Sequence, residues 1–328
     1  MIRFRAWAAL VGLIAGSTLF VSFAAAAENL LGLPTPRDPA RPGAVVLHGG
    51  GRIDQEVFDR FVELAGGANA SIVLIPSAGY RPTDYGEAEL RATLARRFGS
   101  WVGLARAGRI KSFQFLYTDD PADADDPAFV RPLETATGVW FSGGDQTRLN
   151  YRFVGNFPEQ TRFQQALRGI VERGGVVGGT SAGMAAMPEI MTVSHDRSDF
   201  DSPCTAIAAH GLGLLKNAVV EQHFDARGGR LERFTGLLRD AAQLDALAGR
   251  KNAGAHIIGL AAEERTAIVV QGDRVQALGS ASAHIFLKSL AGRTIIWHEL
   301  RSGDSARLTL EVTAGAAIRL EEPVLAQR

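Results

Sequence analysis

Cysteine is nearly absent from the sequence. Cys204 is the only one among 328 residues, so no disulfide can form within the chain and its stability must come from a packed core. A content of 46% hydrophobic and 21% charged residues is that of an ordinary globular protein, which can build such a core. Cys204 follows Asp201-Ser202-Pro203, where no turn would expose and activate a thiol, so we expect a small, partly buried residue rather than a nucleophile.

The sequence also lacks an excess of charge of either sign. Its 35 Lys and Arg residues balance its 35 Asp and Glu residues. A chain without net charge has no general attraction for nucleic acids or anionic lipids, so we expect neither as a partner, and a charged substrate must be recognised locally. No cluster of His or Cys has metal-ligand spacing, and we expect neither a metal nor another cofactor.

A long apolar run occurs at the N-terminus, between the basic residues Arg3 and Arg5 and the small residues 24–27. This order is typical of a signal peptide that is cleaved before Glu28. A retained membrane anchor is the alternative, but residues 6–23 are short for a span and no basic stop-transfer flank follows them. We therefore expect export to the periplasm or the medium without a stable membrane anchor, and the sequence leaves open whether the protein forms a homodimer.

Short apolar runs alternate with amphipathic segments of helical length through the first two thirds of the chain. The strand-like runs are Ala44–Leu47, Ser71–Pro76, Phe113–Tyr117, Val139–Phe141 and Gly175–Gly178. The helical segments are Asp54–Leu64, Gly86–Phe98, a stretch after Asp145, and Ser181–Met187. This alternation predicts an α/β fold with a mostly parallel sheet and helices on both faces, in which ligands bind at the carboxyl ends of the strands.

The pattern changes after about Ile257, where strand-like runs follow one another with short turns. These runs are Ile257–Ala261, Ala267–Val270, Val275–Leu278, Thr294–Trp297 and Leu308–Val312. They predict a C-terminal antiparallel β extension of the same domain. Without an internal repeat or linker, we expect a signal peptide at 1–27, an extended lead-in at 28–43 and one domain at 44–328.

A serine lies between the strand-like run at 175–178 and the helical segment that follows it. Gly179-Thr180-Ser181-Ala182-Gly183 matches G-x-S-x-G, in which flanking glycines relieve crowding in a strained turn that exposes the serine hydroxyl. The Ala182 amide, at the start of a helix, can donate to an oxyanion. The pattern predicts a nucleophile at Ser181.

A nucleophilic serine needs a base, and the chain offers seven histidines. His223 follows the apolar run at 218–220, so it also lies at the carboxyl end of a strand. His48 follows a strand and could line the site as well. A histidine in such a position is more often structural than catalytic, so the pattern alone leaves the assignment open.

Four motifs in a fixed order carry a specific resemblance. Phe141–Gln146 reads FSGGDQ, Gly178–Gly183 reads GGTSAG, Gly211–Leu215 reads GLGLL and Glu221–Phe224 reads EQHF. Together they resemble the serine peptidase family of cyanophycinase and bacterial aspartyl dipeptidase. The resemblance implies a class I glutamine-amidotransferase-like α/β fold with serine where those enzymes carry cysteine.

The resemblance also implies a catalytic triad, with Ser181 as nucleophile and His223 as general base. The third member of the family's triad is a glutamate in a D-E-x-T-A motif, which reads E-E-R-T-A here and assigns Glu264. The segment between His223 and this motif is longer than usual, so Glu263 and, more remotely, Asp225 are alternatives.

Two further roles follow from the family's Gly-Gly turn, which faces the substrate carbonyl. The amides of Gly144 and Asp145 are candidates for a second oxyanion donor beside Ala182, and Gln146 is a candidate for a substrate contact. The residues alone predict only a turn at Gly143–Gly144 after a strand.

Charged residues around His223 relate to the substrate. Cyanophycinase carries Asp-Gln-His-Phe followed by arginines, which fits a polymer of aspartate with arginine side chains. Here Glu221 replaces the aspartate, Gln222 is kept, and the arginines are spaced one residue wider, at Arg227, Arg230 and Arg233. We expect these residues to bind substrate, while the alternative is a solvated helix face with Glu232 and Asp240 as partners.

The leading hypothesis is an exported serine peptidase that hydrolyses β-aspartyl-arginine linkages of cyanophycin to dipeptides through an acyl-enzyme on Ser181. One alternative is a peptidase for short aspartyl or isoaspartyl peptides. Another is a non-catalytic protein that binds β-aspartyl peptides, although a protein without activity would be free to lose Ser181 or His223.

Overall fold

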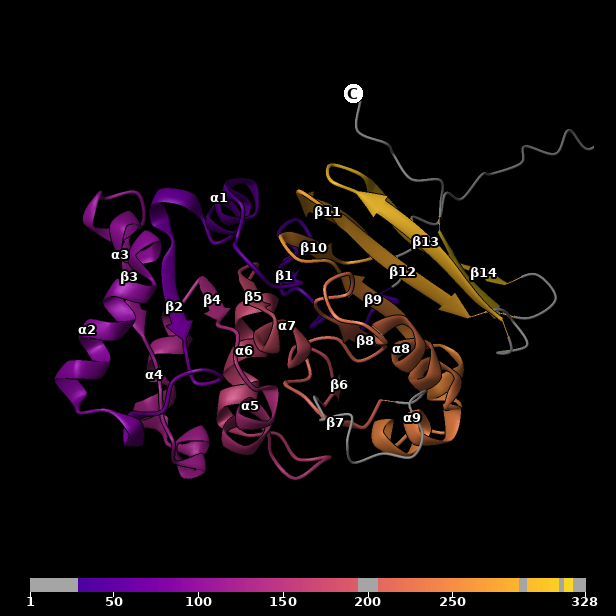
Figure 1. Cartoon of the computed structure of the whole chain (residues 1–328), viewed down its shortest axis with the longest axis horizontal. Helices are drawn as coiled ribbons and strands as arrows, with labels where there is room; N and C mark the ends of the chain where they lie inside the picture. The colour runs from indigo at the N-terminus through magenta and orange to yellow at the C-terminus, as the bar shows by residue number, and fades with distance from the viewer. Residues whose placement is uncertain (1–28, 194–205, 289–293, 313–315, 321–328) are drawn as a thin grey trace, which may run out of the picture.

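The computed structural model describes residues 29–193, 206–288, 294–312 and 316–320 (Figure 1). The expected signal peptide at 1–27 and Cys204 lie outside these residues. The division into a lead-in and one domain stays a prediction.

A large mixed sheet organises the chain. Its strands are β1 (Ala44–His48), β2 (Ser71–Ile75), β3 (Ser112–Phe115), β4 (Gly138–Phe141), β5 (Val176–Thr180), β10 (Thr266–Gln271), β11 (Arg274–Gly279), β14 (Ser305–Val312) and β15 (Ala316–Leu320). In the described part of the chain they lie in the order β15-β14-β11-β10-β1-β5-β4-β2-β3. Strands β1, β5, β4, β2 and β3 are parallel neighbours, and the remaining strands add to β1 in antiparallel fashion.

A smaller sheet lies beside the antiparallel strands (Figure 1). It contains β8 (Ala218–Glu221), β9 (Ile258–Ala262), β12 (Ser282–Lys288) and β13 (Ile295–Arg301), in the order β13-β12-β9-β8 among the described residues. Strands β8 and β9 are parallel, whereas β12 pairs antiparallel with both of its neighbours. Strands β6 (Ile190–Thr192) and β7 (Ala208–His210) form a separate antiparallel pair. The chain passes from the smaller sheet to the large one in the turn between β9 and β10.

Helices cover both faces of the parallel strands. The helices are α1 (Gln55–Leu64), α2 (Glu87–Arg97), α3 (Gly99–Arg106), α4 (Pro127–Thr135), α5 (Gln146–Phe153), α6 (Arg162–Glu172), α7 (Ala182–Ala185), α8 (Arg230–Arg239) and α9 (Ala241–Ala248), with single 3-10 turns at Gly67–Asn69, Pro82–Asp84, Pro121–Asp125 and Ala253–Ala255. Because side chains alternate along a strand, Ala44 and Val46 of β1 pack with α1 and α3, whereas Val45 and Leu47 pack with α4, α5 and α6. Helices α8 and α9 cover the smaller sheet.

Side-chain caps fix where several helices begin. Asp126 and Asp145 accept hydrogen bonds from the second following amide and start α4 and α5. Thr161 and Gln164 form a reciprocal capping box at the start of α6. The cap at Asp145 matters for the site because it fixes the chain directly after the Gly143–Gly144 turn.

The predicted α/β fold with a mostly parallel sheet and a C-terminal antiparallel extension is confirmed. The sequence pattern did not predict that the C-terminal strands divide between two sheets, nor did it predict β12. Within the described ranges no helix is long and apolar enough to cross a bilayer, and no group of three or more His, Cys, Asp or Glu is arranged to hold a metal ion.

Candidate active site

Ser181 occupies a sharp turn between β5 and α7. Its backbone has φ 55° and ψ −117°, a conformation that costs energy for a residue with a side chain. A Cβ on Gly179 would lie 2.6 Å from the carbonyl carbon of Gly183, and a Cβ on Gly183 would lie 2.5 Å from the Phe141 carbonyl oxygen. Both glycines of the G-x-S-x-G motif are therefore required by the close backbone contacts of the turn that presents Ser181.

His223 lies just beyond β8 and reaches Ser181 from the smaller sheet. The distance between Ser181 Oγ and His223 Nε2 is 2.7 Å. His223 also has positive φ, at 49°, and its amide donates to the Gly49 carbonyl at 2.8 Å. The loop after β1 comes so close that a Cβ on Gly50 would lie 2.2 Å from the imidazole Cε1. The glycines after β1 thus leave room for the histidine ring.

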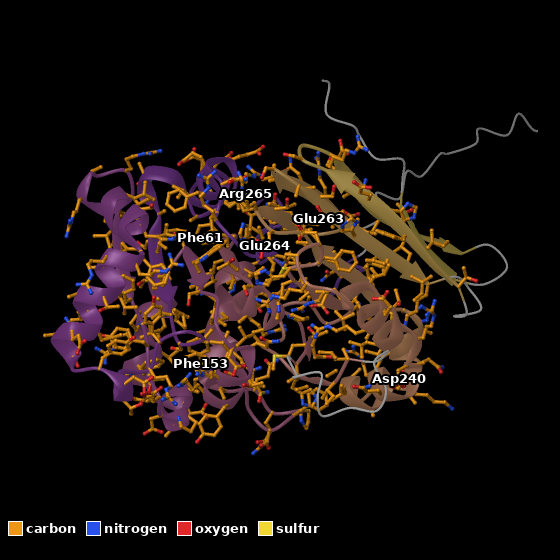
Figure 2. The ribbon with its side chains drawn as sticks, viewed as in Figure 1. Phe61, Phe153, Asp240, Glu263, Glu264 and Arg265 are labelled. Atoms are coloured by element: carbon orange, nitrogen blue, oxygen red, sulfur yellow. The ribbon has the colours of Figure 1, made fainter. Side chains whose placement is uncertain are left out.

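Glu264 lies in the turn between β9 and β10, near the centre of the molecule (Figure 2). The distance between its Oε1 and His223 Nδ1 is 2.5 Å. The turn is held from two sides, because Asp225 accepts the Glu264 amide at 2.9 Å and the Arg265 amide donates to Gly50 at 2.8 Å. Asp225, a weighed alternative for the acid, thus contacts the backbone of this turn.

The hydrogen bonds among these three side chains define their proton positions. A carboxylate only accepts, so His223 Nδ1 carries a hydrogen that it donates to Glu264. Its Nε2 is then free to accept the hydroxyl hydrogen of Ser181. Burial lowers the pKa of His223, and the hydrogen bond that its Nδ1 donates to Glu264 acts in the opposite direction. A neutral imidazole beside the serine is the state that a general base requires.

Glu263 faces away from His223. Its Oε1 lies 3.0 Å from His284 Nε2, and its Oε2 accepts the Ser282 amide at 3.0 Å. The Trp297 indole donates to His284 Nδ1 at 3.0 Å, so His284 is neutral and donates to Glu263. Sequence reasoning missed His284 and Trp297, because nothing in their local sequence indicates that β12 and β13 bring them behind the Glu263–Glu264 turn.

The Gly143–Gly144 turn lies against Ser181. A Cβ on Gly143 would be 3.6 Å from Ser181 Oγ. The Asp145 amide donates to the Ala78 carbonyl at 3.0 Å, so its prediction as an oxyanion donor is wrong for this conformation. The Gly144 and Ala182 amides make no hydrogen bond to any described residue and remain candidates.

The two predicted glutamines are both buried. Gln146 is 1% exposed, and its Nε2 donates to the Thr192 carbonyl at 3.0 Å, which ties α5 to β6. Gln222 is 3% exposed, and its Oε1 has no hydrogen-bond partner among the described residues. An unsatisfied buried oxygen next to His223 retains the capacity to accept a hydrogen bond from a buried water.

Glu221 and two of the predicted arginines form a buried ion cluster. Glu221 is 0% exposed, and its carboxylate accepts from Arg230 Nη1 and, at 2.9 and 2.8 Å, from Arg233 Nε and Nη2. A side chain without exposed surface cannot contact substrate in this conformation, so the prediction that Glu221 binds substrate directly is wrong. The solvated-face alternative is wrong for Arg230, which is 5% exposed. Arg227, by contrast, is exposed.

Replacing Glu221 with glutamine is expected to destabilise the protein. The change leaves two guanidinium groups without their carboxylate, and removing one partner of a buried pair costs about 3–5 kcal/mol. Thermal or denaturant unfolding measures this loss. The matched control is Glu232→Gln on the exposed side of α8, for which we expect a change within about 0.5 kcal/mol. Equal, small effects of both changes would contradict the structural role of Glu221.

His48 lies near the triad but faces the protein interior. It is 0% exposed, and its Nδ1 is 2.7 Å from Thr180 Oγ1. Burial lowers its pKa to about 4, so the ring is neutral at ordinary pH. His48 therefore packs under the elbow and does not line an open site.

Comparison with known proteins defines the class to which this site belongs. Residues 45–278 match the family model described as Peptidase family S51. The chain belongs to this family.

Two relatives from cyanobacteria show how far the similarity extends. A cyanophycinase from Synechococcus elongatus is 32% identical over 181 residues, which are 55% of this chain but only 51% of that protein. A cyanophycinase from Geminocystis herdmanii is 28% identical over 233 residues, which are 70% of this chain and 74% of that protein. The chain thus spans about half the length of the first relative.

A solved structure supports the fold. A peptidase from an acI-B1 Actinobacterium superposes with a TM-score of 0.54 at 22% sequence identity, covering 81% of this chain and 97% of that one. At this level of identity, the likeness concerns the fold.

Proposed function

We propose that this chain is a serine peptidase that cleaves cyanophycin to β-aspartyl-arginine dipeptides, with Ser181, His223 and Glu264 as its catalytic triad. The observation that carries the proposal is the continuous hydrogen-bonded chain from Ser181 Oγ through His223 to Glu264, with distances of 2.7 and 2.5 Å. The polymer is proposed as substrate because the relatives of the chain are cyanophycinases.

In the proposed mechanism, Ser181 Oγ attacks the carbonyl carbon of the amide that joins two dipeptide units while His223 Nε2 takes the hydroxyl proton. Glu264 holds the Nδ1–H and stabilises the imidazolium that forms. The Gly144 and Ala182 amides donate to the oxyanion. His223 then gives its proton to the leaving nitrogen, and water releases the acyl group from Ser181 by the reverse sequence, which returns the enzyme to its starting state.

The arginines after His223 supply the charge for an acidic substrate. Arg227 is exposed, and its charge acts on His223, which places it close to the reacting atoms. Glu221 neutralises only one of the two guanidinium groups of Arg230 and Arg233, so the cluster keeps one positive charge. We propose that Arg227 and Arg233 hold carboxylates of the substrate, with Glu221 and the buried Arg230 as positioning residues.

The second candidate function is hydrolysis of short aspartyl or isoaspartyl peptides, which the same triad would perform. Incubating the purified protein with insoluble cyanophycin and, separately, with isoaspartyl dipeptides tests both, with products identified by mass. Release of β-aspartyl-arginine from the polymer is the expected result. Cleavage of the short peptides alone would transfer the proposal to the second candidate.

The acid limb of the pH profile of kcat/KM is expected to lie below the ordinary histidine value of 6.5, because burial lowers the pKa of His223 and only the neutral ring accepts the serine proton. Activity should therefore persist as the pH falls through 6.5 and be lost at more acidic values. Removing the carboxylate in Glu264→Gln eliminates the contact that raises this pKa, so any residual activity should persist to still lower pH. An acid limb above 6.5 would contradict the assignment of His223 as the base.

Export is proposed from the N-terminal sequence, in which basic, apolar and small residues follow one another. The mature protein is expected to begin near Glu28 and to occur outside the cytoplasm. N-terminal sequencing of the native protein measures this directly.

A further inference from the structure

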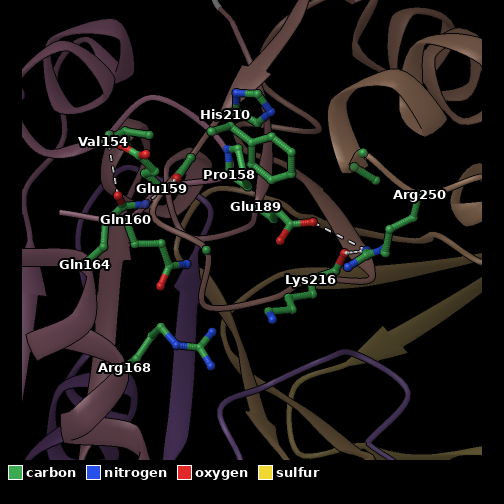
Figure 3. A pocket seen from close by; sticks show the side chains of 16 residues that line it. Val154, Pro158, Glu159, Gln160, Gln164, Arg168, Glu189, His210, Lys216 and Arg250 are labelled. Carbon is green, nitrogen blue, oxygen red and sulfur yellow. Dashed lines mark hydrogen bonds and ion pairs between the residues drawn. The ribbon is translucent and has the colours of Figure 1, made fainter.

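A pocket of about 680 Å³ opens on a part of the surface that none of the proposed triad residues lines. It lies between the loop after α5, the first half of α6 and the segments that follow β7 and α9 (Figure 3). Its volume is in the range of sites for small molecules. Its lining is rich in charge, with Glu159, Arg168, Glu189, Lys216 and Arg250.

Two cationic side chains of this pocket, Arg168 and Lys216, have charged groups whose hydrogen-bonding capacity is not fully used in the described part of the chain. The Nη1 of Arg168 is buried and makes no hydrogen bond, and Lys216 makes no ion pair through its ammonium group. The two side chains point toward each other (Figure 3). Cations whose hydrogen-bond donors are unused favour binding of an anion, because a carboxylate or phosphate would supply the missing hydrogen-bond acceptors.

The pocket also contains a carboxylate, that of Glu189, with one oxygen that accepts no hydrogen bond within the described ranges. Glu189 is 9% exposed, and its Oε1 lies 3.4 Å from an Arg250 nitrogen without accepting a hydrogen bond from any described residue. Arg250 forms an ion pair with this carboxylate, and the charges of Lys216 and Arg168 also act on it. A ligand with both a carboxylate and a cationic donor therefore fits this pocket better than a simple anion.

An aromatic surface completes the lining. Phe157 is 39% exposed and stacks on His210, with ring centroids 4.5 Å apart and planes inclined by 10°. His210 is fixed by donation from its Nε2 to the Leu247 carbonyl at 2.9 Å. A rigid, exposed aromatic face is a favourable stacking partner for a planar guanidinium group.

We propose that this pocket is a second binding site for an aspartyl-arginine unit, remote from the triad. Arg168 and Lys216 bind a carboxylate of the unit, while Glu189 accepts from its guanidinium group, which stacks on Phe157. The proposal rests on the proposed function for its choice of ligand. Because every unit of cyanophycin repeats the same charges, binding one unit here raises the effective concentration of the polymer at Ser181.

The test is calorimetric titration of the Ser181→Ala protein, which cannot consume its ligand, with the dipeptide β-aspartyl-arginine. Two binding events are expected. Adding Arg168→Gln or Lys216→Gln should weaken one of them at least tenfold and leave the other unchanged. Lys111→Gln, on an exposed lysine before β3, is the matched control and should change neither event. A single event that is insensitive to Arg168→Gln and Lys216→Gln would overturn the proposal.

Hydrolysis by otherwise unchanged enzyme gives the second readout. Lys216→Gln is expected to raise the apparent KM for the polymer several-fold, while kcat/KM for a short aspartyl peptide stays at the wild-type value. An equal loss for both substrates would contradict a remote site and indicate damage to the triad. Absence of polymer cleavage by the wild-type enzyme would instead contradict the proposed function, and the titration with dipeptide would still decide whether the pocket binds it.

Discussion

Replacing Ser181 with alanine is expected to abolish peptide hydrolysis while the fold is retained. The hydroxyl is the proposed nucleophile, and alanine keeps the Cβ that the turn already accommodates. His223→Ala is expected to cost a similar factor, on the order of 10⁴ or more in kcat, because nucleophile and base act as one unit. Rates of product release, measured by mass spectrometry, test both changes.

Circular dichroism and thermal unfolding of the same variants establish that the fold is intact. Ser112→Ala, at the exposed start of β3, is the matched control and should hydrolyse substrate like the unmodified protein. Activity close to that of the unmodified protein in Ser181→Ala would show that the chain uses another nucleophile.

The second large effect is expected at Glu264. Glu264→Gln replaces a carboxylate that accepts from His223 Nδ1 by an amide that can also donate, so the imidazole is no longer held in the tautomer that accepts the serine proton. In serine proteases the corresponding change lowers kcat by about 10⁴, and we expect a loss of this order. Steady-state kinetics should show the change in kcat.

Glu263→Gln is the natural comparison, because it makes the same chemical change one residue away. Glu263 contacts His284 and Ser282, so its replacement should lower kcat only weakly, by loosening the turn. A large loss of kcat in Glu263→Gln with a small loss in Glu264→Gln would assign the third triad position to Glu263. Small and equal effects at both positions would mean that the acid lies elsewhere.

The parts of the fold that depend on local pattern could be predicted from the sequence. Buried parallel strands such as β1 and β2 are short apolar runs, and Ser181 lies in a turn that its own glycines define. His223 could be recognised as a residue at the end of a strand. These elements are defined by residues that are close to one another in the sequence, so the amino-acid sequence of this chain was sufficient to predict them.

Other parts depend on contacts between distant segments. Glu264 reaches His223 only because β9 and β10 belong to different sheets, so its assignment came from family resemblance. The sequence grouped Glu221 and the arginines as expected substrate contacts. Whether they bind substrate or one another depends on how α8 packs over β8. No local sequence pattern indicated that Ser282 and His284 of β12 contact Glu263, or that Trp297 of β13 contacts His284.

The proposed triad draws one member from each of three places: Ser181 follows a strand of the large sheet, His223 follows a strand of the smaller sheet, and Glu264 occupies the turn where the chain crosses between them. A partly folded chain with either sheet alone would hold a serine without a base or a base without a serine. Peptide cleavage is thus tied to completion of folding, because the three side chains meet only when both sheets have docked.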